Sequence, residues 1–226
     1  MNKHRLRYKR LLRADSIALV CCILIFLIWP QLDLLVSDLF YDANQFYWDQ
    51  NLVVQFIYKL FAKIHFGYLL ALLALLIFAQ RSRRTVLSKQ CGYLLCCLLL
   101  GPGILVNLVL KDNSLGRPRP VHIQHYGGEH RFAAAFHYSG VCRKNCSFVS
   151  GHAAIGYYFL ALAWALRKRY WLYIGLLSGL AIGGIRIVQG GHFLSDVVFA
   201  GWVVYFTSLV LAKLFQLDLA RKVVQP

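Results

Sequence analysis

The stretch CGYLLCCLLLGPGILVNLVL, residues 91–110, contains no charged side chain over its twenty positions. A membrane-spanning helix needs ~20 apolar residues, so this stretch predicts that the chain crosses a bilayer. The whole composition agrees, because 59% of the 226 residues are hydrophobic and the mean hydropathy is +0.55. We therefore expect a polytopic membrane protein of the all-α class.

Five further apolar runs bring the predicted number of transmembrane helices to six. In chain order the six predicted spans are residues 16–29, 64–79, 91–110, 147–166, 170–185 and 193–212. The fifth span carries Gly175, Gly179 and Gly183 at four-residue spacing, which predicts a face for close helix packing. No Pro/Gly/Ser-rich linker divides the chain, so we expect a single membrane domain, residues 1–226.

The distribution of basic residues predicts the topology. A net charge of +16 would suit nucleic acid if it lay on one soluble face, but here the charges fall between apolar runs, so we expect no nucleic-acid partner. Alternation of the six spans places 16 of the 25 basic residues on one side: Lys3, Arg5, Arg7, Lys9, Arg10, Arg13, Arg81, Arg83, Arg84, Lys89, Arg167, Lys168, Arg169, Lys213, Arg221 and Lys222. The positive-inside rule makes that side cytoplasmic, with both termini on it.

One external loop breaks this rule. It joins the third and fourth predicted spans and carries Lys111, Arg117, Arg119, Arg131, Arg143 and Lys144. Positive charge is disfavoured on the translocated side, so a local reason is needed, and an anionic ligand would supply one.

Three polar clusters lie at span ends that this topology places outside. In the last of them, five residues separate Arg186 from His192, and three more separate His192 from Asp196. Residues four apart are neighbours on one helix face, so Asp196 can accept the Nδ1–H of His192 and leave Nε2 free as a nucleophile. The guanidinium of Arg186 can hold phosphate oxygens in a fork.

The other two clusters supply the remaining parts of a phosphoryl-transfer site. Ser150 and Gly151 begin the fourth predicted span, where free N–H groups and the helix dipole favour an anion. His152 lies in the first turn and can donate a proton to a leaving alkoxide. The first cluster, residues 111–120, adds Lys111 and one or two arginines. Phosphoryl transfer needs position, charge stabilisation and an acid for the leaving group, and all three are present.

The three clusters in this order resemble the type 2 phosphatidic acid phosphatase superfamily. Its pattern is Lys-x6-Arg-Pro, then Pro-Ser-Gly-His, then Ser-Arg-x5-His-x3-Asp, and the likeness covers residues 111–196, where the catalytic motifs lie. The resemblance implies metal-independent catalysis without a cofactor, through a phosphohistidine at His192. It implies that Asp196 supports His192, that His152 is the general acid, and that phosphate is bound by Lys111, Arg119, Arg186, Ser150 and Gly151.

The chain departs from the family pattern at three places. Val149 replaces the proline before the second motif, and Ile185 replaces the serine before the third. In the first motif, five residues separate Lys111 from Arg117 and seven separate it from Arg119. We favour Arg119 as the phosphate ligand, because Gly-Arg-Pro-Arg-Pro commonly ends this motif with its second arginine, and Arg117 is the alternative.

Within the superfamily, the chain is most similar to the lipid A 4'-phosphatases of Gram-negative inner membranes. The likeness is carried by residues 101–103, 111–120, 145–149 and 189–193. It implies a periplasmic active site and a phosphorylated lipid as the substrate. The long external loop supports a large sugar-phosphate headgroup, because it carries aromatic residues and an arginine that suit sugars and phosphate: Tyr126, Arg131, Phe132, Phe136 and Tyr138.

Several alternatives stay open at this point. Undecaprenyl diphosphate and phosphatidylglycerophosphate also present a phosphate on an apolar anchor, and the phosphate could pass to another lipid instead of to water. A transporter would need charged residues in mid-span and repeated halves, neither of which is found. A non-catalytic scaffold is disfavoured because His192 and Asp196 are both present.

The external loop contains further polar residues outside the three clusters. Cys142 and Cys146 form a close pair, and in an oxidising compartment such a pair predicts a disulfide, with two free thiols as the alternative. Four histidines of the loop follow no standard zinc spacing, so we expect no metal site: His122, His125, His130 and His137. We interpret them as polar loop residues or contacts to the substrate.

Overall fold

The computed structural model of the chain describes residues 3–112, 115–217 and 219. Asn113 and Ser114 of the first motif, and the basic residues Arg221 and Lys222, lie outside the described residues. The helical elements are α1 (Lys3–Ile28), α2 (Leu32–Asp38), α3 (Leu52–Arg81), α4 (Thr85–Leu98), the π-helix η1 (Leu99–Lys111), the 3-10 turns η2 (Pro120–His122) and η3 (Gln124–Tyr126), α5 (Gly151–Tyr157), the 3-10 segment η4 (Tyr158–Ala161), α6 (Leu162–Ala165), α7 (Tyr170–Val188) and α8 (Leu194–Leu214). The strands β1 (Tyr41–Asp42) and β2 (Gln45–Phe46) form one antiparallel hairpin.

The helices make this a multi-pass membrane protein. Within the described residues, four segments are long and apolar enough to cross a bilayer: α3, α4 with η1 as one 27-residue segment, α7 and α8. A fifth is present if Ala14–Ile28 and α2, which meet at a 78° bend, are counted as one span. The predicted fourth span corresponds to α5, η4 and α6 in succession, and none of these reaches spanning length alone.

The second predicted span was too short. Helix α3 begins at Leu52, not at residue 64, and runs for 30 residues. Its start is fixed by Asn51, whose side-chain oxygen accepts hydrogen bonds from the amides of Val53 and Val54 at 3.0 and 3.2 Å. The sequence hid this start because Lys59 and Lys63 interrupt the apolar run.

The predicted small-residue face of the fifth span is confirmed. In α7, a Cβ atom added at Gly175 would lie 2.4 Å from the amide nitrogen of Leu160, and one at Gly179 would lie 2.1 Å from the ring of Tyr157. Gly183 meets α8 in the same way. These glycines let α7 pack directly on the α5–η4 segment, and this buried pair forms the centre of the bundle.

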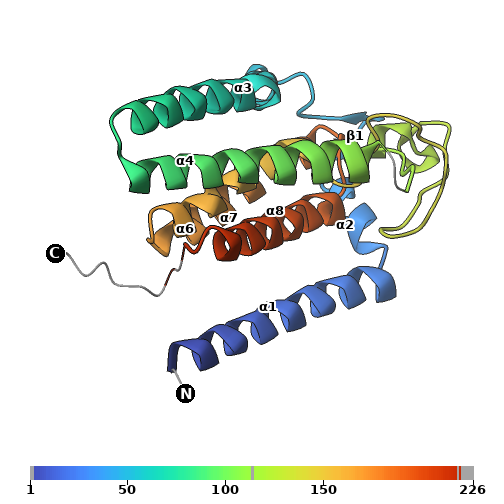
Figure 1. Ribbon diagram of the computed structural model, residues 1–226. Coiled ribbons are helices and arrows are strands. Elements are labelled where there is room, and N and C mark those ends of the chain that lie inside the picture. Colours follow the sequence, from blue (N-terminus) through green and yellow to red (C-terminus); the bar gives the residue numbers. More distant parts are fainter. Residues whose placement is uncertain (1–2, 113–114, 218, 220–226) are drawn as a thin grey trace.

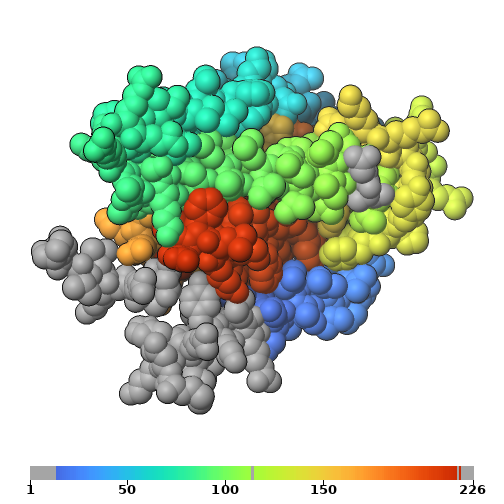
Figure 2. All heavy atoms as spheres, in the orientation of Figure 1, coloured from blue at the N-terminus to red at the C-terminus, as the bar shows by residue number. Residues whose placement is uncertain are grey.

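The polar segments gather at one end of the bundle. Figure 1 shows the start of α3, the end of η1 and the hairpin beside the connection between η1 and α5, whereas α1 begins and α8 ends at the opposite end. Figure 2 shows the same connection, in yellow, covering that end of the molecule. The junction between α7 and α8 lies there too. The three sequence motifs are therefore brought to one end, outside the apolar parts of the helices.

Candidate active site

His192 lies in the short turn between α7 and α8 and is only 1% exposed. Its Nδ1 lies 3.5 Å from Oδ2 of Asp196, an ion-pair distance that is longer than an ordinary hydrogen bond. The two side chains are therefore close, as predicted, but not because they share a helix face. His192 precedes α8, and Asp196 turns back toward it from the first turn of that helix, where it also accepts the amide of Phe193 at 2.8 Å.

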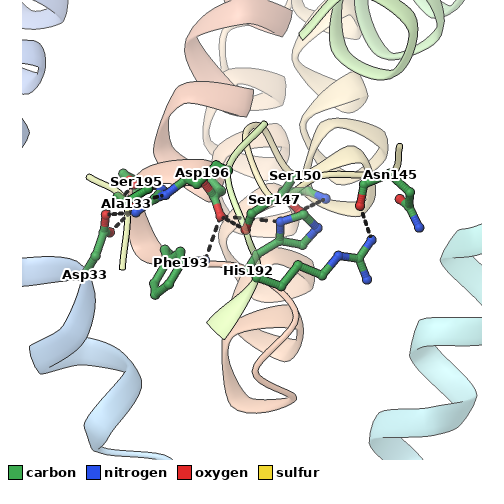
Figure 3. A network of polar contacts seen from close by, with 12 residues as sticks. Asp33, Ala133, Asn145, Ser147, Ser150, His192, Phe193, Ser195 and Asp196 are labelled. Atoms are coloured by element: carbon green, nitrogen blue, oxygen red, sulfur yellow. Dashed lines mark hydrogen bonds and ion pairs between the residues drawn. The ribbon is translucent and has the colours of Figure 1, made fainter. Parts of the chain in front are cut away.

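The Asp196 carboxylate is held on all sides by donors (Figure 3). Besides the amide of Phe193, Oδ2 accepts the hydroxyl of Ser147 at 2.5 Å, and Oδ1 accepts Nη1 of Arg117 at 2.6 Å. Asp196 is fully buried, so these bonds fix the carboxylate in one position beneath the imidazole of His192.

Arg117 is a structural residue at the centre of this network. Its guanidinium donates to Ala133 O at 2.8 Å, to the Ser195 hydroxyl at 2.8 Å and to Asp33 at 2.7 Å, in addition to Asp196. Burial works against its charge, but Asp196 and Asp33 outweigh burial and raise the pKa of Arg117. All four of these contacts are made with groups of the protein itself.

Asp33 is the member of the network that sequence reasoning missed. It lies in α2, 84 positions before Arg117, and is fully buried. Its two oxygens accept the amide of Ser195 at 2.8 Å and the hydroxyl of Ser195 at 2.6 Å, as well as Arg117. The available signal was an acidic residue inside an apolar stretch, LDLLVSD.

Three cations gather on the other side of the histidines. Lys111 ends η1, Arg119 lies near the end of the first motif and Arg186 lies in the last turn of α7, and all three act electrostatically on His152. Lys111 and Arg186 also act on His192. Unlike Arg117, none of the three has a carboxylate within ion-pair distance in the described part of the chain. Partly desolvated cations without an acid partner are suited to bind an anion.

Burial sets the protonation state of His192. It lowers the pKa of His192 to about 3, because the opposing attraction of Asp196 is smaller and the charges of Lys111 and Arg186 add repulsion. The imidazole is therefore neutral at pH 7, and with Nδ1–H directed at Asp196 the lone pair is on Nε2. Among the described residues, neither ring nitrogen of His192 has a hydrogen-bond partner, and Nδ1 is the nitrogen nearer to Asp196, at 3.5 Å.

His152 and Arg186 share one aromatic support. The ring of Tyr58, from α3, stacks on the imidazole of His152 with centroids 4.9 Å apart, and the Arg186 guanidinium lies 4.4 Å from the same ring. Nη1 of Arg186 also donates to Oε1 of Gln189. A Cβ atom at Gly191 would lie 2.1 Å from Nη2 of Arg186, so only glycine permits this arginine to pack against the turn that carries His192.

Ser150 is the N-cap of α5, and much of its hydrogen-bonding capacity is used by the fold. Its hydroxyl oxygen accepts the amide of Ala153 at 3.4 Å, and its own amide donates to the carbonyl of Asp196 at 3.0 Å. The second bond ties the start of α5 to α8 and brings His152 to the same side of the bundle as His192. Gly151 follows directly and lines a cavity together with Lys111 and His152.

The cysteine pair lies beside the cationic cluster. Cys142 and Cys146 are linked by a disulfide with a Cα–Cα distance of 5.6 Å. Between them, the carbonyl of Asn145 accepts Nη2 of Arg119 at 2.9 Å, and the amide of Asn145 donates to Asp112 at 2.8 Å. The short disulfide loop therefore orients the arginine that the first motif contributes.

Most of the loop aromatics pack against other parts of the protein. Phe132 packs edge-on against Phe193 with centroids 5.5 Å apart, and Phe136 packs against Phe199 at 4.7 Å. Tyr126 is 5% exposed and donates its hydroxyl to Asp38. These side chains attach the loop to the bundle, because removing their apolar area from water is favourable. Tyr138 is the most exposed of the loop aromatics named here.

The chain is similar to proteins of known function along most of its length. The sequence pattern of the PAP2 superfamily matches residues 90–219. A protein of Francisella tularensis subsp. novicida (strain U112), named lipid A 4'-phosphatase, is 34% identical over 209 residues, which cover 88% of this chain and 94% of that protein.

Two further proteins with the name lipid A 4'-phosphatase match over shorter stretches. One, from Rhizobium leguminosarum, is 41% identical over 119 residues, half of each chain. Another, from Rhizobium etli, is 38% identical over 138 residues, which cover 58% of this chain and 51% of that protein. No solved structure matches this chain.

Proposed function

This chain belongs to the PAP2 superfamily and is a membrane lipid phosphatase, and from that premise we propose that it hydrolyses the 4'-phosphate of lipid A. The observation that carries the proposal is the group of three cations without acid partners, Lys111, Arg119 and Arg186, beside the buried His192 and the partly buried His152. A phosphate dianion would supply the missing negative charge. The relative from Francisella, aligned over nearly the whole chain, supports lipid A as the lipid that carries it.

His192 is the proposed nucleophile. Its Nε2 attacks phosphorus, a nitrogen–phosphorus bond forms, and the bond from phosphorus to the sugar oxygen breaks. Asp196 holds Nδ1–H and stabilises the positive charge that develops on the ring. Water then gives a proton to His152 and attacks phosphorus, the nitrogen–phosphorus bond breaks, and inorganic phosphate and the neutral imidazole of His192 are released.

His152 is the proposed acid for the leaving alkoxide. Burial and, after it, the three surrounding cations oppose an imidazolium at this position. A bound phosphate dianion offsets the charge of the cations. His152 therefore takes up a proton when the substrate is present and can donate this proton to the departing oxygen. Its Nε2 has no hydrogen-bond partner among the described residues and is free to make that contact.

The phosphate oxygens are assigned to Lys111, Arg119 and Arg186, with the hydroxyl of Ser150 and the amide of Gly151 as additional donors. Between the two arginines of the first motif we choose Arg119, because Arg117 is already paired with two carboxylates. A planar guanidinium on each side of the phosphate would stabilise charge on its equatorial oxygens as the bond breaks.

We propose the same topology as the sequence predicts: six spans, with α5, η4 and α6 together forming the fourth, both termini in the cytoplasm and the active site at the periplasmic face of the inner membrane. Cysteine labelling from the periplasm tests the orientation. A thiol introduced at His125, in the external loop, should react, and one introduced at Arg83 should not. The reverse pattern would place the site in the cytoplasm.

The substrate assay compares two lipids with purified protein in detergent. Lipid A and undecaprenyl diphosphate are offered at matched concentration, and released phosphate is measured. We expect hydrolysis of lipid A that is lost in His192→Ala and kept in His125→Ala, a matched histidine that pairs with Asp38 at the surface. Turnover of undecaprenyl diphosphate alone would overturn the choice of substrate, and full activity of His192→Ala would overturn the nucleophile.

A further inference from the structure

A second cavity lies next to the cationic cluster, and Gln189 is the one described residue of the three motifs that lines it. Its volume is about 260 Å³, and it lies between the β1–β2 hairpin and the external loop, at the polar end of the bundle. Pockets for drug-sized ligands range over ~300–1,000 Å³, so this one suits a group no larger than a single sugar ring.

The walls of the cavity combine aromatic rings with amide and carboxylate side chains. Tyr41, Phe46 and Tyr126 pack on one another with centroids 4.8 to 5.2 Å apart and form an ordered aromatic wall. The exposed wall carries four short polar side chains: Asn44, Gln45, Asp49 and Gln50. An aromatic surface beside side chains that both donate and accept hydrogen bonds matches the two kinds of surface that a sugar presents.

The hairpin holds Asn44 and Gln45 in place through its backbone, and Asp49 and Gln50 follow it in the chain. Tyr41 pairs with Phe46 and Asp42 with Gln45, and the two turn residues Ala43 and Asn44 both have positive φ values. A two-residue turn of this kind gives the hairpin a defined register. The side chains of Gln45 and Gln50 are exposed and thus accessible to a ligand.

One residue belongs to both the cavity and the phosphate site. Gln189 lines the cavity, and its Oε1 accepts Nη1 of Arg186, a proposed phosphate ligand. Asp49, on the cavity wall, also acts electrostatically on Arg186. A phosphate held by Arg186 would therefore have the cavity one side chain away, within reach of the sugar attached to that phosphate.

We propose that this cavity binds the monosaccharide unit that carries the scissile phosphate. The inference rests on the proposed function, since it takes the substrate to be a sugar phosphate on a lipid anchor. Gln45 and Gln50 are assigned as hydrogen-bond partners of the sugar hydroxyl or amide groups, and Gln189 separates the sugar from the phosphate while touching both subsites.

The test uses the full-length double variant Gln45→Ala/Gln50→Ala in detergent. Two quantities are measured: the KM for lipid A, and the inhibition constant of inorganic phosphate, which occupies only the cationic cluster. Each substitution removes one hydrogen bond to the sugar, which is worth about fivefold in affinity. With both glutamines replaced, the KM for lipid A should rise about 25-fold. The phosphate constant should stay unchanged, because Lys111, Arg119 and Arg186 are intact. The control is Gln80→Ala, an exposed glutamine near the far end of α3.

Each outcome has one reading. An unchanged KM for lipid A, in a wild-type protein that hydrolyses lipid A, would overturn the sugar subsite and leave the proposed function standing. An equal rise in KM and in the phosphate constant would also overturn it, because the glutamines would then act on the phosphate site. A wild-type protein that releases no phosphate from lipid A would overturn the proposed substrate and the subsite together.

Discussion

Replacement of Asp33 by asparagine should destabilise the protein although Asp33 is distant in sequence from every motif. Asp33 is fully buried, and its oxygens accept three hydrogen bonds, from Arg117 at 2.7 Å and from Ser195 at 2.6 and 2.8 Å. An asparagine of the same shape replaces one oxygen with an NH₂ group. Because two of the three contacts come from N–H donors, at least one of them would then face another donor.

The expected loss follows from the burial of the pair. Removing one partner of a buried ion pair costs ~3–5 kcal/mol, since the remaining charge stays desolvated. Arg117 keeps Asp196 at 2.6 Å, so we expect a loss near the lower limit, about 3 kcal/mol. For a chain of this length, 1 kcal/mol shifts the melting temperature by ~2–4 °C, so Tm should fall by roughly 6–12 °C.

Thermal unfolding of the purified variants in one detergent measures this shift. The matched control is Asp38→Asn in the same helix, whose carboxylate is 44% exposed and pairs with His125. An exposed pair contributes ~0–1 kcal/mol, so this control should melt within a few degrees of the wild type. Equal melting temperatures for Asp33→Asn and the wild type would refute the role given to the network, and so would an equal fall in both variants.

Three further predictions separate the proposed roles within the site. Arg119→Ala should weaken inhibition by inorganic phosphate about 10- to 100-fold with little change in Tm. Arg117→Ala should lower Tm sharply. If Arg117 were the phosphate ligand instead of Arg119, the two variants would show the reverse results. The pKa of His192 is about 3 in the folded protein and near 6.5 when unfolded, so below pH 6.5 the unfolded chain takes up a proton that the folded chain does not. Stability should therefore decline from pH 7 to pH 5, less so in His192→Gln, and an equal decline in both proteins would contradict the buried neutral state. The double variant Cys142→Ser/Cys146→Ser should release the Asn145 carbonyl and raise the KM for lipid A several-fold, while an unchanged KM would show that the disulfide does not position Arg119.

The sequence alone was sufficient for the membrane class, for the small-residue face of α7 and for the order of the motifs. These properties are local: twenty uncharged residues in 91–110 require an apolar environment, and glycines at four-residue spacing in α7 require a close neighbour. The three motifs could be placed at one end because span alternation alone fixes which connections share a side.

The tertiary structure decided which residues act together. Arg117 and Arg119 are two positions apart and chemically identical, yet only the fold pairs Arg117 with Asp33 and leaves Arg119 among cations without acid partners. Sequence spacing carries no information about a contact across 84 positions, and the burial that gives an ion pair its energy exists only when α2, the external loop and α8 are packed together. The sugar cavity also exists only in the folded chain. Its walls come from residues 41–50, from Val121 and Tyr126, and from Gln189, and helices separate these parts in the sequence.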